Sequence, residues 1–108
     1  MTPEQVFAVL RKTGLPVAYD HFAEGESPDP PFIVFLFPGS SNMFADDKVY
    51  HKINQLNVEL YTARKAPETE DALEGVLSDH EIPWEKSETW IPSEQMYEVL
   101  YQTEITGG

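Results

Sequence analysis

The clearest hydrophobic pattern in this chain is a run of six apolar residues, Phe32 to Phe37, between Pro31 and Pro38. The run is too short to span a bilayer, and its aromatic and β-branched residues predict a strand that is covered on both faces. Helices of the same chain can cover one of these faces. We therefore expect the second face to meet another sheet layer or a neighbouring subunit.

Two other segments have the spacing of amphipathic helices. The first opens with a capping box at residues 2–5, has proline at its first helical position and should end at Thr13, before Gly14. The second begins at Pro67 and has a narrow apolar stripe formed by Leu73, Val76, Leu77 and His80. Both helices suit packing against a sheet.

Alternation of apolar and polar residues predicts four more strands, over residues 15–22, 48–62, 82–90 and 96–106. The last two form a terminal hairpin. The strand over 48–62 alternates in odd register up to Ile53 and in even register from Leu56. We expect a β-bulge at Asn54-Gln55, which keeps one core face continuous; without it, the two halves of the strand would face opposite sides.

The order of these elements is α-β-β-β-α-β-β, which predicts one α+β domain over residues 1–108. Its sheet would be mostly antiparallel, with about five strands and with both helices packed on one face. The length fits a single domain, and 41% hydrophobic residues are enough to build a core.

Charge is distributed unevenly along the chain. Nineteen acidic residues against seven basic ones give a net charge of −12, which argues against binding nucleic acid by neutralising phosphates. An acidic face on a neighbouring copy could meet the only basic stretch head to tail, a contact that closes rings. The alternative is a solvated surface with an ordinary charge bias. The cations of the basic stretch are Lys48, Lys52, Arg64 and Lys65.

Three large apolar residues lie where a partner could reach them. Met43 and Phe44 stand among turn formers in the connection 38–47, and loops of this kind often dock on a partner. Trp84 and Trp90 share one face of the predicted strand 82–90. Trp84 suits the edge of the core, whereas Trp90, beside the turn, is an interface candidate.

Candidate chemistry is sparse. The chain has no cysteine, no phosphate-binding glycine motif and no nucleophile elbow, and its adjacent acids point to opposite faces of a strand. The histidines lie in three different elements without metal-ligand spacing: His21, His51 and His80. We therefore predict no metal, no cofactor and no enzymatic activity. A divalent-metal enzyme using Asp46, Asp47 or a histidine is an open alternative.

Four segments carry a family resemblance: the helix opening Thr-Pro-Glu-Gln-Val-Phe, the stretch Pro-Phe-Ile-Val-Phe-Leu-Phe-Pro-Gly-Ser-Ser-Asn, the strand Lys-Val-Tyr-His-Lys-Ile-Asn-Gln-Leu-Asn-Val-Glu-Leu-Tyr-Thr, and Lys-Ser-Glu-Thr-Trp-Ile. Their order resembles that of small phage neck proteins, from the head-tail module of long-tailed phages and prophages of Gram-positive hosts. These are the tail-completion, tail-terminator and head-tail joining proteins.

The resemblance implies a structural virion protein that forms a ring, commonly a hexamer. The ring would cap the tail tube, made of the major tail protein, or join it to the head connector. It implies loop contacts that map onto residues 39–47 and the first half of the strand 48–62. The protein would lie in the host cytoplasm during assembly and then in the virion neck, because no secretory signal or membrane span is evident.

A second hypothesis comes from the charge alone. An acidic inhibitor could mimic DNA and block a host nucleic-acid enzyme, because residues 66–108 carry eleven acids against Lys86. In this segment the acids alternate with core residues in short strands, which differs from the phosphate-like spacing that a DNA mimic needs.

Overall fold

The computed structural model describes residues 1–23, 25–40, 43–45, 48–51 and 53–106. The elements in chain order are α1 (Pro3–Leu10), a 3₁₀ helix η1 (Arg11–Thr13), β1 (Val17–Tyr19), β2 (Phe32–Leu36), β3 (Met43–Ala45), β4 (Lys48–His51), β5 (Ile53–Thr62), α2 (Pro67–Asp79), β6 (Glu85–Ile91) and β7 (Met96–Thr106).

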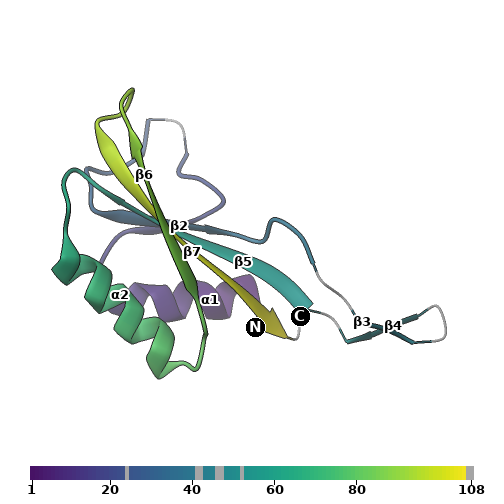
Figure 1. Ribbon diagram of the computed structural model, residues 1–108. Coiled ribbons are helices and arrows are strands. Elements are labelled where there is room, and N and C mark those ends of the chain that lie inside the picture. The colour runs from purple at the N-terminus through teal and green to yellow at the C-terminus, as the bar shows by residue number, and fades with distance from the viewer. Residues whose placement is uncertain (24, 41–42, 46–47, 52, 107–108) are drawn as a thin grey trace.

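Five strands form the main sheet, in the order β1-β2-β5-β7-β6, with α1 and α2 on one face (Figure 1). This confirms the predicted α+β class. The sheet is mixed, because β1 and β2 run parallel and pair Val17 with Ile33, whereas all other neighbours are antiparallel. Parallel neighbours need a long connection, which the loop between Tyr19 and Phe32 supplies.

The first helix begins and ends as its sequence predicts. Thr2 Oγ1 accepts a hydrogen bond from the Gln5 amide at 3.2 Å, and Gln5 Oε1 accepts one from the Thr2 amide at 2.8 Å. These two bonds are the predicted capping box. The helical segment ends at Thr13, followed by Gly14 with φ +84°, a left-handed conformation that glycine adopts without strain.

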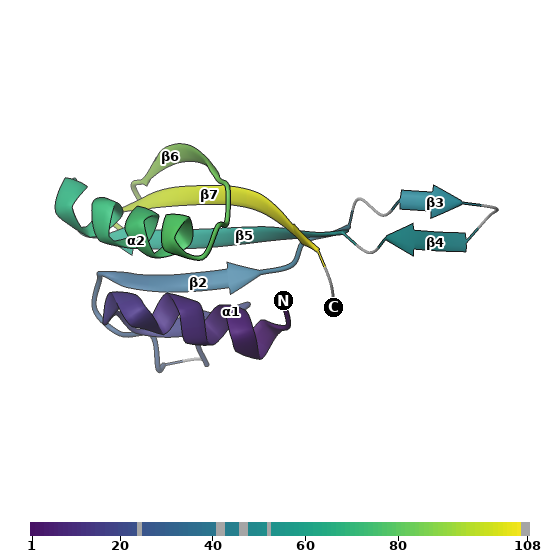
Figure 2. The same ribbon diagram turned by 90° about the horizontal axis from the view of Figure 1, so that it is seen from below.

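The core lies between the two helices and the sheet. Ile33 and Phe35 of β2 are fully buried on the helix face, as are Val58 on β5 and Tyr101 on β7. On the opposite face of the sheet, called here the open face, no described helix covers the strands (Figure 2).

The structure corrects the expectation that the apolar run needs a second layer or subunit. On the open face, Phe32 is 6% exposed and Val34 is 7% exposed. Phe22 meets Phe32 edge-on at 5.4 Å between ring centroids, and Tyr61 stacks on Phe32 at 5.1 Å. Residues of the same chain therefore already cover both faces of most of the run.

The predicted strand 48–62 is two strands in two sheets. Residues of β5 pair with β7 in one unbroken register from Ile53 opposite Thr106 to Thr62 opposite Tyr97, so the predicted bulge at Asn54-Gln55 is wrong. Ile53, the last residue of the odd alternation, lies on the face of β5 opposite to Leu56, and residues 48–51 belong to a second sheet. There β4 pairs with β3, an unpredicted strand, and this pair, called here the ribbon, extends away from the main sheet (Figures 1 and 2).

Candidate functional site

The ribbon is the part of the chain most distant from the core. Its strands pair antiparallel, with Phe44 opposite Val49 and Ala45 opposite Lys48, and the register shifts between Met43 and Phe44. The ribbon extends outward from the end of the sheet at which β5 begins (Figure 2). The molecule measures 49 Å along its longest axis and 29 and 23 Å along the other two. The predicted partner residues Met43, Phe44 and Lys48 therefore share one projecting element. Lys52 lies outside the described residues.

The other predicted interface residues lie at the far end of the sheet. Trp90 is 44% exposed, and its ring packs against Tyr97 with centroids 4.7 Å apart. Lys65 Nζ lies 5.5 Å from the centre of the Tyr97 ring. Tyr97 pairs with Thr62, the last residue of β5, whereas the ribbon lies before Ile53, the first residue of β5. At 3.3 Å per strand residue, the length of β5 separates the two ends by about 30 Å.

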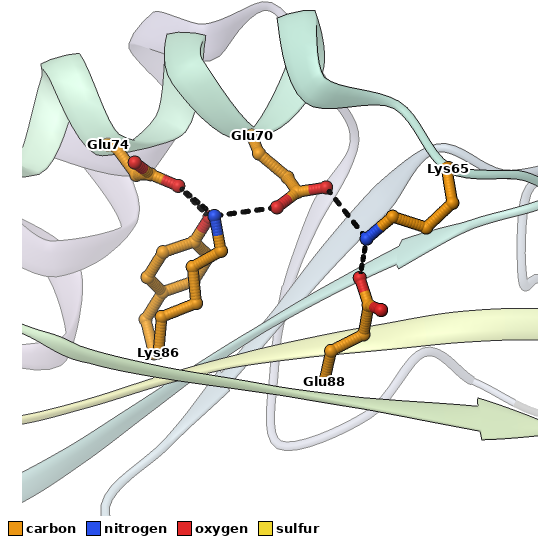
Figure 3. Close-up of polar contacts among 6 residues, drawn as sticks. Lys65, Glu70, Glu74, Lys86 and Glu88 are labelled. Carbon is orange, nitrogen blue, oxygen red and sulfur yellow. Dashed lines mark hydrogen bonds and ion pairs between the residues drawn. The ribbon is translucent and has the colours of Figure 1, made fainter.

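A network of ion pairs joins α2 to the edge strand β6 (Figure 3). Lys86 Nζ on β6 lies 2.7 Å from Glu70 Oε1 and 2.8 Å from Glu74 Oε2, both on α2. Lys65 Nζ contacts Glu88 Oε1 and lies 3.8 Å from Glu70 Oε2. Both carboxylate oxygens of Glu70 therefore face a lysine, although its side chain is only 6% exposed.

The network shifts the protonation of its members. Hydrogen bonds to Glu70 and Glu74 raise the pKa of Lys86, and burial, together with the bond to Glu74, raises the pKa of Tyr101. Burial raises the pKa of Glu74, but hydrogen bonds from Lys86 and Tyr101 outweigh it, so the net shift is downward. The charged forms of Lys86 and Glu74 are thus favoured in the fold.

The described cations of the predicted basic stretch do not come together as one patch. Lys48 belongs to the ribbon, Lys65 is held by Glu88 and Glu70, and Arg64 is exposed at the far end of the sheet with no ion pair among the described residues. Sequence inspection overlooked Lys86 as the centre of the network, because its acidic partners lie on a different element and only folding brings them close.

The open face is acidic and polar. The hydroxyl of Tyr61 lies 2.9 Å from Glu59 Oε1 and 2.9 Å from Glu98 Oε2, so two carboxylates compete for one hydroxyl hydrogen. Burial raises the pKa of Glu59; the Tyr61 hydrogen bond opposes this shift, and the negative charge of Glu98 adds to it. Near the β6 start lies an open depression of about 760 Å³, whose ionisable lining residues are Glu85 and Glu104.

The described residues hold no arrangement that indicates catalysis. They contain no group of three or more histidine, aspartate or glutamate side chains placed to bind a metal ion. His21 contacts Asp20 at 3.0 Å, and His80 Nε2 lies 2.9 Å from Lys12 Nζ, each on the surface. No described helix combines the length and the apolar character needed to cross a membrane.

One apolar feature was not predicted. A notch of about 230 Å³ opens beside α1 and β1, and its lining residues are Pro3, Glu4, Phe7, Tyr19 and Phe35. Tyr19 is 50% exposed, so a large aromatic residue is open to solvent beside the notch. The only sequence signal near the notch was the alternation of Val17, Tyr19 and His21. Alternation predicts a strand, but it does not tell that this strand lies at the edge of the sheet.

No protein-family model matches the chain, and no curated protein sequence matches it. A chain of the solved structure described as the virion of a native gene transfer agent particle has a similar fold. The TM-score is 0.58 at 13% sequence identity, and the alignment covers 93% of this chain and 86% of that chain. At this identity the likeness establishes a shared fold.

Proposed function

We propose that this chain is a structural subunit of a phage-like virion that assembles into a ring in the head-tail module. The ring, of about six copies by the family resemblance, caps the tail tube or joins it to the head connector. The observation that carries the proposal is a projecting ribbon on a domain whose fold matches, over 93% of the chain, a component of a gene transfer agent virion.

The distribution of candidate contacts supports head-to-tail assembly. Met43, Phe44 and Lys48 lie on the ribbon, whereas Arg64, Lys65 and Trp90 lie at the opposite end of the sheet. Distinct surfaces at two ends of an elongated subunit favour a heterologous interface, which closes into a ring when the rotation between copies permits. The sequence adds Lys52 to the ribbon side of this interface.

The charge of the chain fits a passage for DNA. A net charge of −12 repels phosphates, and the open face contributes the carboxylate pair of Glu59 and Glu98. An acidic channel wall allows a genome to pass without adhering. The partners in this proposal are other copies of the chain and the major tail protein or the connector, and the subunit has no enzymatic role.

The proposal is tested by mixing the purified chain with the tail-tube and connector proteins encoded beside its gene. We expect rings by mass photometry and negative-stain microscopy, alone or on the tube. Phe44→Asp should lose ring formation while keeping the wild-type circular dichroism spectrum, and Ser78→Asp, on the exposed side of α2, should assemble normally. A wild-type chain that binds neither partner and is dispensable for tail completion would overturn the proposal.

The DNA-mimic hypothesis is weakened by the ion pairs. Three of the eleven acids in residues 66–108, namely Glu70, Glu74 and Glu88, are bound to lysines of the same chain and are not free to imitate phosphates. Salt-sensitive capture of a host nuclease or polymerase, with no binding to tube or connector, is the result that would favour it.

A further inference from the structure

The notch lined by Pro3, Glu4, Phe7, Tyr19 and Phe35 is an opening from the surface into the core. Phe35 forms its floor and is fully buried, whereas Tyr19 is 50% exposed. The two rings stack at 5.1 Å with an interplanar angle of 10°, and Phe7 lies 6.5 Å from Phe35 on the helix side. The walls are therefore aromatic and their geometry is set by stacking.

The notch has the size of a receptor for side chains. Its volume of about 230 Å³ is below the range of about 300–1,000 Å³ that is usual for small-molecule pockets. Interfaces between proteins concentrate binding energy where one or two large apolar side chains enter such aromatic sites. Phe37, edge-on to Tyr19 at 6.0 Å, extends the apolar surface toward the side on which the ribbon begins.

Two carboxylates, one of them paired with His21, lie at or beside the notch. Glu4 forms part of its lining, and Asp20, whose amide donates to the Phe35 carbonyl at 2.7 Å, follows Tyr19 with an exposed carboxylate. Arg11 covers the Phe7 ring at 5.5 Å but does not line the notch. An apolar segment with a neighbouring cation therefore matches this surface.

The ribbon has that composition. Met43, Phe44 and Ala45 are three consecutive apolar residues on β3, and Lys48 pairs with Ala45 from β4. The ribbon of each copy leads away from its own α1 (Figures 1 and 2), so a ribbon that occupies the notch comes from another copy. We infer that the notch receives Met43 and Phe44 from the ribbon of the next copy, an inference that rests on the proposed function.

This contact makes each copy a donor on one side and an acceptor on another. Such an interface is heterologous, so it links copies in one direction, and it closes a ring when the rotation between copies permits. The inference places the acceptor half of the ring contact at the notch instead of at Arg64, Lys65 and Trp90, whereas the proposed function requires only that some contact exists.

Two variants and their mixture test the inference. Phe44→Asp removes the donor and Tyr19→Asp places a charge on the acceptor. Each should reduce the ring population about tenfold or more, because central apolar anchors dominate such interfaces. An equimolar mixture should form heterodimers and stop there, since only the intact ribbon of the Tyr19→Asp copy can meet the intact notch of the Phe44→Asp copy. Native mass spectrometry resolves monomer, heterodimer and ring.

Folding is checked by thermal melting, and Tyr19→Ser replaces Tyr19→Asp if the latter unfolds. Ser78→Asp, on the exposed side of α2, is the control that should form wild-type rings. Rings from either variant alone, or a mixture without heterodimers, would overturn the inference and leave the proposed function intact. If Tyr19→Asp still forms rings but no longer binds the tail tube, the notch binds the tube protein, and the inference is overturned too. A wild-type chain that never assembles would overturn both.

Discussion

Lys86 offers the sharpest test of what holds the edge strand β6 to the helix layer. Its ammonium lies 2.7 Å from one carboxylate oxygen of Glu70 and 2.8 Å from Glu74. Lys86→Met keeps the length of the apolar stem and removes the charge. The variant leaves the Glu70 carboxylate, 6% exposed, with Lys65 at 3.8 Å as its remaining cation.

The size of the loss follows from burial. Removing one partner of a fully buried ion pair costs about 3–5 kcal/mol, because the other charge is left without compensation. The Lys86 side chain is 35% exposed, so water replaces part of its effect, and Lys65 retains part of the rest. We therefore expect a loss of about 2 kcal/mol, which lowers the melting temperature of a domain of this size by roughly 10 °C.

Urea denaturation at pH 7, followed by circular dichroism, measures the loss. The matched control is Lys65→Met, which removes a cation of the same network whose side chain is 51% exposed; its effect should be much smaller. The double variant Lys86→Met/Glu70→Gln should recover much of the loss, because the more buried of the two carboxylates is then neutral, while Glu74 keeps its hydrogen bond from Tyr101.

Two results would refute this reasoning. If Lys86→Met costs no more than Lys65→Met, the buried end of Glu70 does not depend on Lys86. If the double variant is as unstable as the sum of its single variants, the two side chains act independently and the ion pair is not the cause of the loss.

Three further predictions concern the core, the first helix and the open face. Phe35→Asp should abolish the cooperative thermal transition, because it buries a charge in a fully covered site. Thr2→Ala should reduce the free energy of unfolding by about 1 kcal/mol through loss of the capping box. Burial raises the pKa of Glu59 above 4.5, so the folded state loses stability as the pH rises from 4.5 and this carboxyl ionises. Glu59→Gln should flatten this part of a urea-stability profile between pH 4.5 and 7, and an unchanged profile would contradict the assignment.

Local sequence signals predicted the parts of the fold that local interactions determine. The capping box at Thr2, the left-handed Gly14 and the terminal hairpin each depend on residues close in sequence, and all three are present. The mixed sheet was not predicted, because alternation in residues 15–22 gives a strand but not the direction of its neighbour.

The ribbon was missed for a related physical reason. Alternation reports which side chains share a face, and it does not report which strand pairs with which. A phase change between Val49 and Leu56 was visible in the sequence, but a bulge in one sheet and a passage between two sheets give the same pattern. Only the pairing of β4 with β3 and of β5 with β7 separates the two cases.

The apolar run Phe32 to Phe37 is linked to assembly through Phe35 alone and not through an uncovered face of the strand. Phe32 and Val34 are covered within the chain, so the run itself does not require a partner. Phe35, however, is at once a core residue and the floor of the notch. A variant at Phe35 therefore loses folding and assembly together, and it cannot tell one from the other. Tyr19 lies outside the buried core cluster and Phe44 belongs to the ribbon, so their variants can separate a defect in the ring contact from a defect in the domain.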